Sequence, residues 1–432
     1  MGAIRRALGQ RGLRLLLGAG LVSLTGDWVL RVGLAYYVYA LTGSTLASAS
    51  MLLASFVPQI LLGSLAGVFV DRWDRRRTMV LANLALALGL LPLLAVERPG
   101  QIWIVYVVLT WEGCVQQFFS PAELSALPAL AGDEHLLTAN ALGSQNQDLS
   151  RLVGSAVGGV LAAAGGIDPL ALVDLASFVA SAALIARISL PSEVAARESA
   201  GASLRHRVAD LRGEWGDGLR LAVHEPMLRL VLVFLLVTSV GQGIFSTLFA
   251  PFVRSVLHGG GAAYGVIVSV QAIGGIGGGL LVAALGNRWR PARMLGCAAV
   301  VFGLVDLALI LYPLVWTAVW PAAALITLAG VPGAFIVAAA MTLLQQHTGD
   351  RYRGRVFGAL GAVEGVAMVV GILAAGALGG SVGIVPVLVT QGVGYVLAGA
   401  LVLAGLTRTA PAPRSHPAAL PAGPQTERSR CA

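Results

Sequence analysis

Two ionisable side chains occupy the middle of the first long apolar run of the sequence. Asp27 and Arg31 lie four residues apart, on the same face of a helix, where they can form an ion pair. Asp27 lies ~20 Å beyond Arg14 along such a helix, deep inside the run. A carboxyl group there can bind and release a proton, with Arg31 adjusting its proton affinity. The alternative is a neutralised pair that only holds helices together.

Further charged side chains lie inside other apolar runs. Glu112 is near the middle of its run, where a protonated carboxyl bonded to a neighbouring helix is the alternative to a functional group. Asp148 and Arg151 are three apart and can pair within one helix. Glu364 is equally consistent with a functional and a structural role. The candidates for proton coupling are therefore Asp27, Arg31, Glu112, Asp148, Arg151 and Glu364.

The composition places these residues in a membrane. The chain has 432 residues, of which 57% are hydrophobic and 12% charged, with a mean hydropathy of +0.81. These values exclude a soluble domain. Cys114, Cys297 and Cys431 lack the spacing of a disulfide framework or a metal site. Since no catalytic triad or phosphate-binding loop is visible either, we expect no enzyme and no cofactor, with a proton gradient as the energy source.

Twelve runs are long and apolar enough to span a bilayer, which takes about 20 residues. They predict an all-α membrane protein with twelve transmembrane helices in two six-helix halves. The runs are Leu15 to Leu41, Leu46 to Val70, Thr78 to Val96, Ile102 to Phe119, Ala139 to Gly165, Leu170 to Ile188, Leu228 to Phe252, Tyr264 to Leu285, Met294 to Tyr312, Trp316 to Leu344, Val356 to Leu378 and Val382 to Leu406.

The arginines set the orientation. The net charge of +8 comes from basic residues that are all arginine. With both termini in the cytoplasm, all but four arginines lie on the cytoplasmic side; Arg98 and Arg254 lie outside, and Arg31 and Arg151 lie in the membrane. The charge therefore indicates a multi-pass protein of the bacterial inner or plasma membrane and not a nucleic-acid partner.

The longest polar segment divides the chain. We expect an N-terminal six-helix half over 1–190, a cytoplasmic linker over 191–225, a C-terminal half over 226–407 and a disordered cytoplasmic tail over 408–432. In the linker, apolar residues recur at helical spacing among arginines, which predicts an amphipathic helix on the inner membrane surface.

The two halves repeat each other. When the sequence is aligned with itself at a shift of 216 residues, Asp71-Arg72-Trp73 matches Asn287-Arg288-Trp289. At a shift of 217 residues, Gly113 matches Gly330. Offsets differing by one residue at corresponding loops indicate the duplication of a six-helix unit.

The loop after the second run carries a recognisable pattern. A glycine, Gly67, is followed by Asp71-Arg72, by Asp74 and by the basic cluster Arg75 to Arg77. Gly63 and Gly67 lie on one helix face and allow another helix to approach closely. The loop resembles the one between helices 2 and 3 of the major facilitator superfamily, except that Asp74 stands where that family usually has glycine.

Other motifs restrict the resemblance to one branch of this superfamily. They resemble motifs of the bacterial branch that includes macrolide-efflux and siderophore-export proteins. The motifs are Leu24-Thr25-Gly26-Asp27-Trp28, Pro121-Ala122, Ala139-Asn140-Ala141-Leu142, Arg151-Leu152-Val153-Gly154, Asp174-Leu175-Ala176-Ser177-Phe178, Gly218-Leu219-Arg220 and Arg353-Gly354-Arg355-Val356-Phe357.

The resemblance implies a cytoplasmic gate. Asp71 would meet the N-terminal end of the eleventh helix near Arg355, and Arg72 would hold it by charge pairing. Gly63, Gly67 and Arg75 would complete the gate. The alternative is that the arginines of the loop only fix the topology.

The resemblance also implies a substrate cavity between the halves. Fourth helices of the superfamily line it, which makes Glu112 the first candidate for contact with a cargo. Helix packing is the alternative role for the other members. The set comprises Trp28, Glu112, Gln116, Gln242, Phe245 and Gln271. The small residues from Gly154 to Gly159 resemble an antiporter motif, with Ser155 in place of proline, and are expected to pack against the eighth helix. Asp306, on the peripheral ninth helix, is expected to be structural.

These expectations favour a monomeric secondary transporter in the lipid bilayer that exports small organic compounds by proton-coupled alternating access. The cargo would be a drug, a siderophore or another secondary metabolite. A solute importer or lysophospholipid flippase of the same fold, or a receptor or assembly protein without transport, are the alternatives.

Overall fold

The computed structural model describes residues 6, 8–70, 73–189, 216, 219–348 and 353–408. Within these ranges the chain forms long helices and no strand. The helices are α2 (Arg11–Thr42), α3 (Thr45–Val70), α4 (Arg75–Leu90), α5 (Ile102–Gly165), α6 (Asp168–Ile185), α8 (Pro226–Ser255), α9 (Gly261–Leu285), α10 (Pro291–Leu311), α11 (Trp320–His347), α12 (Arg353–Ser381) and α13 (Ile384–Arg408), with short 3₁₀ turns at Leu91–Ala95, Pro99–Gln101, Gly286–Arg288 and Tyr312–Leu314.

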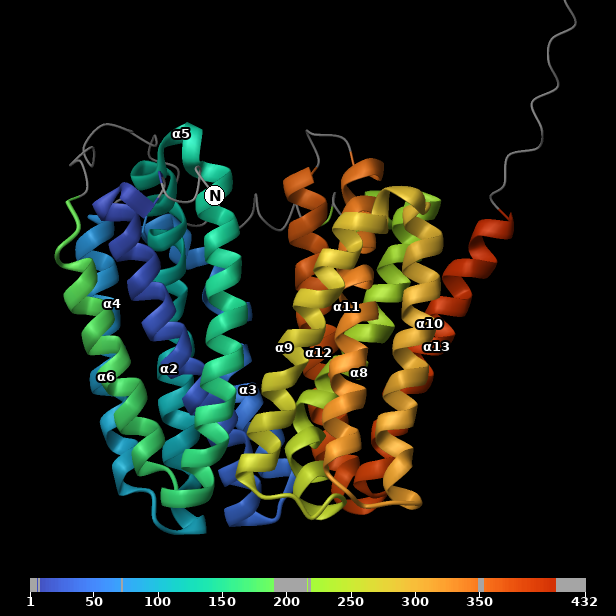
Figure 1. Cartoon of the computed structure of the whole chain (residues 1–432), viewed down its shortest axis with the longest axis horizontal. Helices are drawn as coiled ribbons and strands as arrows, with labels where there is room; N and C mark the ends of the chain where they lie inside the picture. The colour runs from blue at the N-terminus through green and yellow to red at the C-terminus, as the bar shows by residue number, and fades with distance from the viewer. Residues whose placement is uncertain are drawn as a thin grey trace, which may run out of the picture.

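One of these helices crosses the bundle twice. α5 turns back at Gly132, whose φ of 66° and ψ of 164° are not helical. Figure 1 shows its two limbs descending from a common turn. Eleven helical segments of the described chain are long and apolar enough to span a membrane, and the second limb of α5, which carries Asp148 and Arg151, makes a twelfth crossing. The predicted all-α fold with twelve spans is therefore confirmed.

The predicted duplication is visible in the packing. In the first half α2 packs on α5 and α6, α4 packs on α5 and α6, and α3 packs on α5. In the second half α8 packs on α12 and α13, α10 packs on α11 and α13, and α9 packs on α11. Each contact in one half thus has its counterpart in the other, as expected for a six-helix unit used twice.

The halves meet mainly along two helix pairs, α5 with α9 and α3 with α12, with smaller contacts of α2 with α8. Glycines allow the close approach that was predicted for the antiporter-like motif: a Cβ atom at Gly159 would lie 2.5 Å from the carbonyl oxygen of Gly261. Gly154 and Gly158 instead lie against the α2 backbone, near Thr25 and Val29. The motif therefore packs α5 on two helices at once.

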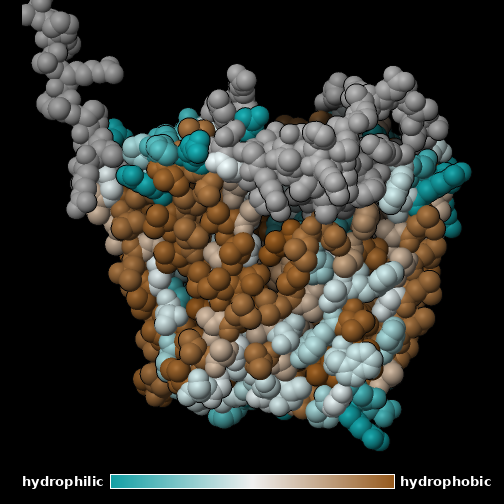
Figure 2. Space-filling model, turned by 180° about the vertical axis from the view of Figure 1, so that it is seen from behind, coloured by the Kyte–Doolittle hydropathy of each residue, from teal (hydrophilic) through white to brown (hydrophobic). Residues whose placement is uncertain are grey.

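Hydrophobic side chains cover the outside. Leu81 and Leu88 of α4, two turns apart, are 65% and 67% exposed. Figure 2 shows hydrophobic residues over most of the middle of the visible face and hydrophilic residues at its upper and lower edges. This is the surface of a protein whose solvent is the lipid bilayer.

The described chain begins and ends on the same face, which we call the N-terminal face (Figure 1). The amphipathic helix predicted in the linker and the tail beyond 408 lie outside the described residues, as do Asp71 and Arg72. Asp74 is the N-cap of α4, and its carboxylate accepts a 2.7 Å hydrogen bond from the backbone N–H of Arg77. The departure from glycine at this position thus has a local structural reason.

Candidate functional site

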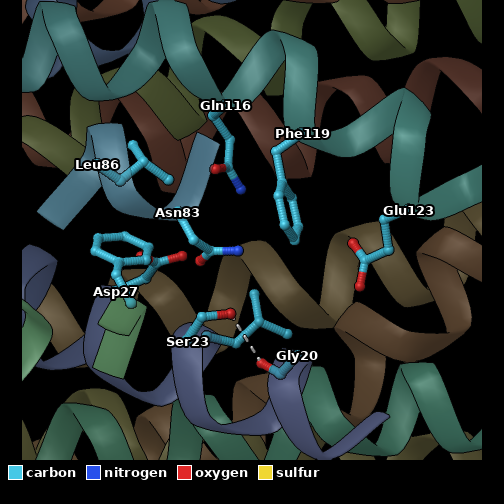
Figure 3. Close-up of a pocket in the computed structure, with 10 residues that line it drawn as sticks. Gly20, Ser23, Asp27, Asn83, Leu86, Gln116, Phe119 and Glu123 are labelled. Carbon is cyan, nitrogen blue, oxygen red and sulfur yellow. Dashed lines mark hydrogen bonds between the residues drawn. The ribbon is translucent and has the colours of Figure 1, made fainter. Parts of the chain in front are cut away.

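A polar cavity lies inside the first half of the molecule, enclosed by α2, α4, α5 and α6. The space inside it that water can occupy is about 30 Å³. Figure 3 shows Asp27 and Glu123 near opposite ends, with Asn83 and Phe119 between them. The residues that line it are Gly20, Ser23, Leu24, Asp27, Asn83, Leu86, Gln116, Phe119, Glu123 and Phe178.

Asp27 is the acidic residue of α2 in this cavity. Its Oδ1 atom is buried and has no hydrogen-bond partner among the described residues. The carboxyl groups of Glu112, Glu123 and Asp174 and the guanidinium of Arg31 all act on it electrostatically. A buried carboxyl oxygen without a donor is costly, so its retention in the bundle calls for a functional reason.

The expected ion pair between Asp27 and Arg31 is not formed within the described chain. Arg31 is exposed, and its guanidinium carbon lies 5.5 Å from the centroid of the Trp28 ring. A cation stabilised by an aromatic face does not need a direct carboxylate partner. Arg31 acts on Asp27 through the electrostatic field instead.

Arg151 likewise does not pair with Asp148 in the described chain. Its Nη2 donates a short hydrogen bond to Oε1 of Gln271 on α9, and its guanidinium carbon lies 5.3 Å from the Trp28 centroid. The Arg151 side chain therefore reaches from the first half to the second. The Gln271 carbonyl oxygen is a hydrogen-bond acceptor there, and the Trp28 ring provides an aromatic face. Two predicted residues from different halves, Arg151 and Gln271, are in this way brought together with Trp28.

Glu112 lies on the first limb of α5, and its Oε2 atom is buried without a hydrogen-bond partner in the part of the chain that the structure describes. Gln116, one turn further on, lines the cavity. Both belong to the first half of the molecule. The cavity we observe is thus inside one bundle, whereas the predicted substrate cavity lies between the two.

The predicted residues of the second half lie elsewhere. Gln242 is exposed on α8, and Phe245 stacks on Phe249 at 4.5 Å between ring centroids. Glu364 is half-buried on α12. Asp306 is 2% exposed on α10, and no described residue forms a hydrogen bond with its Oδ2 atom.

The gate set is only partly described. Gly63 and Gly67 lie within α3, and Arg355 is half-buried near the start of α12. Arg75 donates a 3.2 Å hydrogen bond to the carbonyl oxygen of Ser125 on α5. Since α4 packs on α5 of its own half, this bond of Arg75 lies within the first half.

Two acidic residues of this site were missed. Glu123 lies on the same face of α5 as Glu112, Gln116 and Phe119, and this spacing of four, three and four residues was the signal available in the sequence. Asp174 is fully buried on α6 and accepts a 3.0 Å hydrogen bond from the Ser177 hydroxyl.

The comparisons with known proteins agree with this architecture. A family model described as transmembrane secretion effector matches residues 6–422. The chain is 27% identical to the multidrug efflux pump Tap of Mycolicibacterium fortuitum, over 87% of this chain and 91% of that protein. It is 24% identical to macrolide efflux protein A of Streptococcus pyogenes, over 82% and 85%. It is also 24% identical to the enterobactin exporter EntS of Citrobacter koseri, over 78% of each.

The fold is similar to that of a bacterial homologue of the iron transporter ferroportin in an inward-facing state. The TM-score is 0.73 at 14% identity, over 91% of this chain and 98% of that one. At this identity the likeness concerns the fold alone. The resemblance found in the sequence is confirmed by the family match, which spans nearly all of the chain. The chain therefore belongs to the transmembrane secretion effector family of major facilitator superfamily transporters.

Proposed function

We propose that this transporter exports a small, partly apolar organic compound from a bacterial cell in exchange for protons. The observation that carries the proposal is the Asp27 carboxyl group, which faces a polar cavity with a buried, unpartnered oxygen. Such a group can take up a proton without breaking an existing hydrogen bond. Three relatives, which are exporters of a macrolide, of several drugs and of enterobactin, support the direction of transport.

The duplication supports the assignment of proton coupling to the first half. An offset of 215 residues lays Gly26-Asp27 on Gly241-Gln242, and an offset of 217 lays Asp174 on Gln391. Gly26 packs against Asp174, and Gly241 packs against Gln391 in the same way. At both equivalent positions the second half carries an amide, which cannot take up a proton at physiological pH. The titratable version of the site therefore belongs to the first half.

The distribution of arginine supports the orientation. Arg75 and Arg76 lie beside the start of α4 on the N-terminal face, whereas Arg98 and Arg254 lie at the opposite face. An excess of basic residues marks the cytoplasmic side. The N-terminal face is accordingly cytoplasmic, with both termini inside the cell.

Growth inhibition tests this function directly. Wild type and Asp27→Asn are expressed at matched membrane levels in a bacterial host that lacks its own pumps, and growth is measured across a panel of antibiotics and dyes. We expect wild type to protect against at least one compound and Asp27→Asn to lose that protection. Asp306→Asn, which changes a buried carboxyl group outside the cavity in the same way, is the matched control. It should still protect the host against the compound. Equal protection by Asp27→Asn would remove the proton-coupling role.

A further inference from the structure

Glu123 lies closer to the N-terminal face than Asp27 does. It is on the first limb of α5, shortly before the turn at Gly132 on that face. Its Oε1 atom lies 3.4 Å from the position of a Cβ atom on Gly20, so the two residues are at the same depth. Gly20 precedes Asp27 on α2 by seven residues, a rise of about 10 Å. Glu123 is therefore about two helical turns nearer the end of the bundle.

The cavity connects the two carboxyl groups. Glu123 and Asp27 both line it, and polar side chains of Ser23, Asn83 and Gln116 line the space between (Figure 3). Asn83 is 1% exposed, and its amide donates a 3.0 Å hydrogen bond to the carbonyl oxygen of Met79. A polar space of this size is suited to water, which bridges groups that do not touch.

This route is separate from the boundary between the halves. Every residue that lines the cavity belongs to α2, α4, α5 or α6. The contacts that join the halves at this depth, Arg151 with Gln271 and Ser269 with Leu152, lie on the second limb of α5 and on α9. A cargo that passes between the halves would not enter the cavity.

We propose that Glu123 transfers protons between Asp27 and the cytoplasm through this cavity, so that protons and cargo follow different routes. The proposal rests on the role of Asp27 and on the orientation given above. During export, protonated Asp27 gives its proton through bridging water to the Glu123 carboxylate, which then releases it to the cytoplasm. The same proton leaves Asp27 and arrives at Glu123, so charge is conserved.

Other charged groups face Asp27 and set the conditions of the transfer. Glu112 on α5, Asp174 on α6 and Arg31 on α2 are the charged groups near Asp27 besides Glu123. These groups are all in the first half. None of them lines the cavity, which leaves Glu123 as the carboxyl group that shares it with Asp27.

Proton uptake after a pH jump tests the route without any cargo. The full-length protein in detergent is mixed with acid in a stopped-flow instrument, and a soluble pH indicator reports the uptake. The part that is lost in Asp27→Asn is assigned to Asp27. We expect Glu123→Gln to slow this part by about tenfold or more while its amplitude remains, and Glu123→Asp to restore most of the rate.

Asp306→Asn is the control and should leave the rate unchanged, because Asp306 lies outside the cavity. An unchanged rate in Glu123→Gln would overturn the proposal, since protons would then reach Asp27 by another route. Identical uptake in wild type and Asp27→Asn would overturn it too, since nothing would be relayed. A slowed uptake in a protein that protects against no compound would retain the route and remove the export function.

Discussion

At the residue scale, four buried carboxyl groups of the described chain each keep one oxygen without a hydrogen-bond partner. They are Asp27, Glu112, Asp174 and Asp306, and the other oxygen of Asp174 accepts a hydrogen bond from Ser177. Burial of a polar group without a hydrogen bond costs about 1–3 kcal/mol in proteins. The second half holds the amides Gln242 and Gln391 at the positions equivalent to Asp27 and Asp174, and Oε1 of Gln391 is likewise buried without a partner in the described chain. An unpartnered oxygen by itself therefore does not identify a proton-exchanging group; Asp27 is distinguished because it also lines the polar cavity together with Glu123.

Asp74 carries a prediction at this scale. Replacing it by alanine removes the 2.7 Å bond to the N–H of Arg77 and should lower the free energy of unfolding by about 1 kcal/mol. Replacement by glycine, the residue of the wider family, should cost only a few tenths of a kcal/mol, because glycine is tolerated at an N-cap. Unfolding of both variants in mixed micelles checks the order. Equal losses for the two would contradict the capping role.

At the scale of elements, glycine decides which helices touch. A Cβ atom on Gly159 would lie 2.5 Å from the carbonyl oxygen of Gly261 and 2.6 Å from Cα of Gly265. On α9, a Cβ atom on Gly274 would meet the backbone of Thr327, and one on Gly278 would meet Val331. The glycine-rich stretch of α9 thus packs helices, as expected, and α5 and α9 approach at backbone distance without the proline of the antiporter motif.

Gly159→Ala should therefore be destabilising by about 1–3 kcal/mol, because the new methyl group meets backbone atoms that cannot move independently. Gly143→Ala, on the same limb of α5 with nothing within 4 Å of its Cβ position, is the matched control. It should be neutral or stabilising by up to ~1 kcal/mol. Unfolding measurements on the pair distinguish close packing from a general effect of glycine in a helix. A similar result for both would rule out the proposed contact.

At the scale of the whole molecule, contacts near the face opposite the N-terminal face hold the halves together. Arg254 of α8 donates a 2.9 Å hydrogen bond to the Tyr36 hydroxyl of α2 and lies over its ring, 5.5 Å from the centroid. The hydroxyl groups of Tyr39 and Ser255 are 2.9 Å apart. Opening of this face by movement of the halves requires these contacts to break.

Arg254→Ala should accordingly favour the state in which that face is open. Val32 of α2, 3% exposed in the core shared by the halves, is replaced by cysteine in a background without native cysteines. Labelling by a water-soluble maleimide then reports opening. We expect Arg254→Ala to raise the labelling rate by about tenfold. A factor of this size corresponds to the free energy that one charge-assisted hydrogen bond contributes to the closed state. Tyr36→Phe, which keeps the ring, should have a smaller effect, and an unchanged rate in Arg254→Ala would exclude a closing role.

The sequence alone determined the number and order of the membrane helices and their duplication. It also determined the family, through motifs such as those around Asp27 and Arg151. Each of these properties is local, because a run of about 20 apolar residues enters a bilayer whatever its neighbours are. The polar face of α5 that holds Glu112, Gln116 and Glu123 could likewise have been read from spacing alone.

Only the tertiary structure decided which polar groups meet. Arg151 was expected to pair with Asp148, three residues away, yet it bonds to Gln271, which is 120 residues away. Asp27 was expected beside Arg31, yet it shares a cavity with Glu123 and Asn83 from other helices. Hydropathy fixes where a helix enters and leaves the membrane, but the rotation of each helix about its axis depends on how side chains from distant segments pack. That packing, set here by glycines at the helix contacts, determines which buried charges face one another.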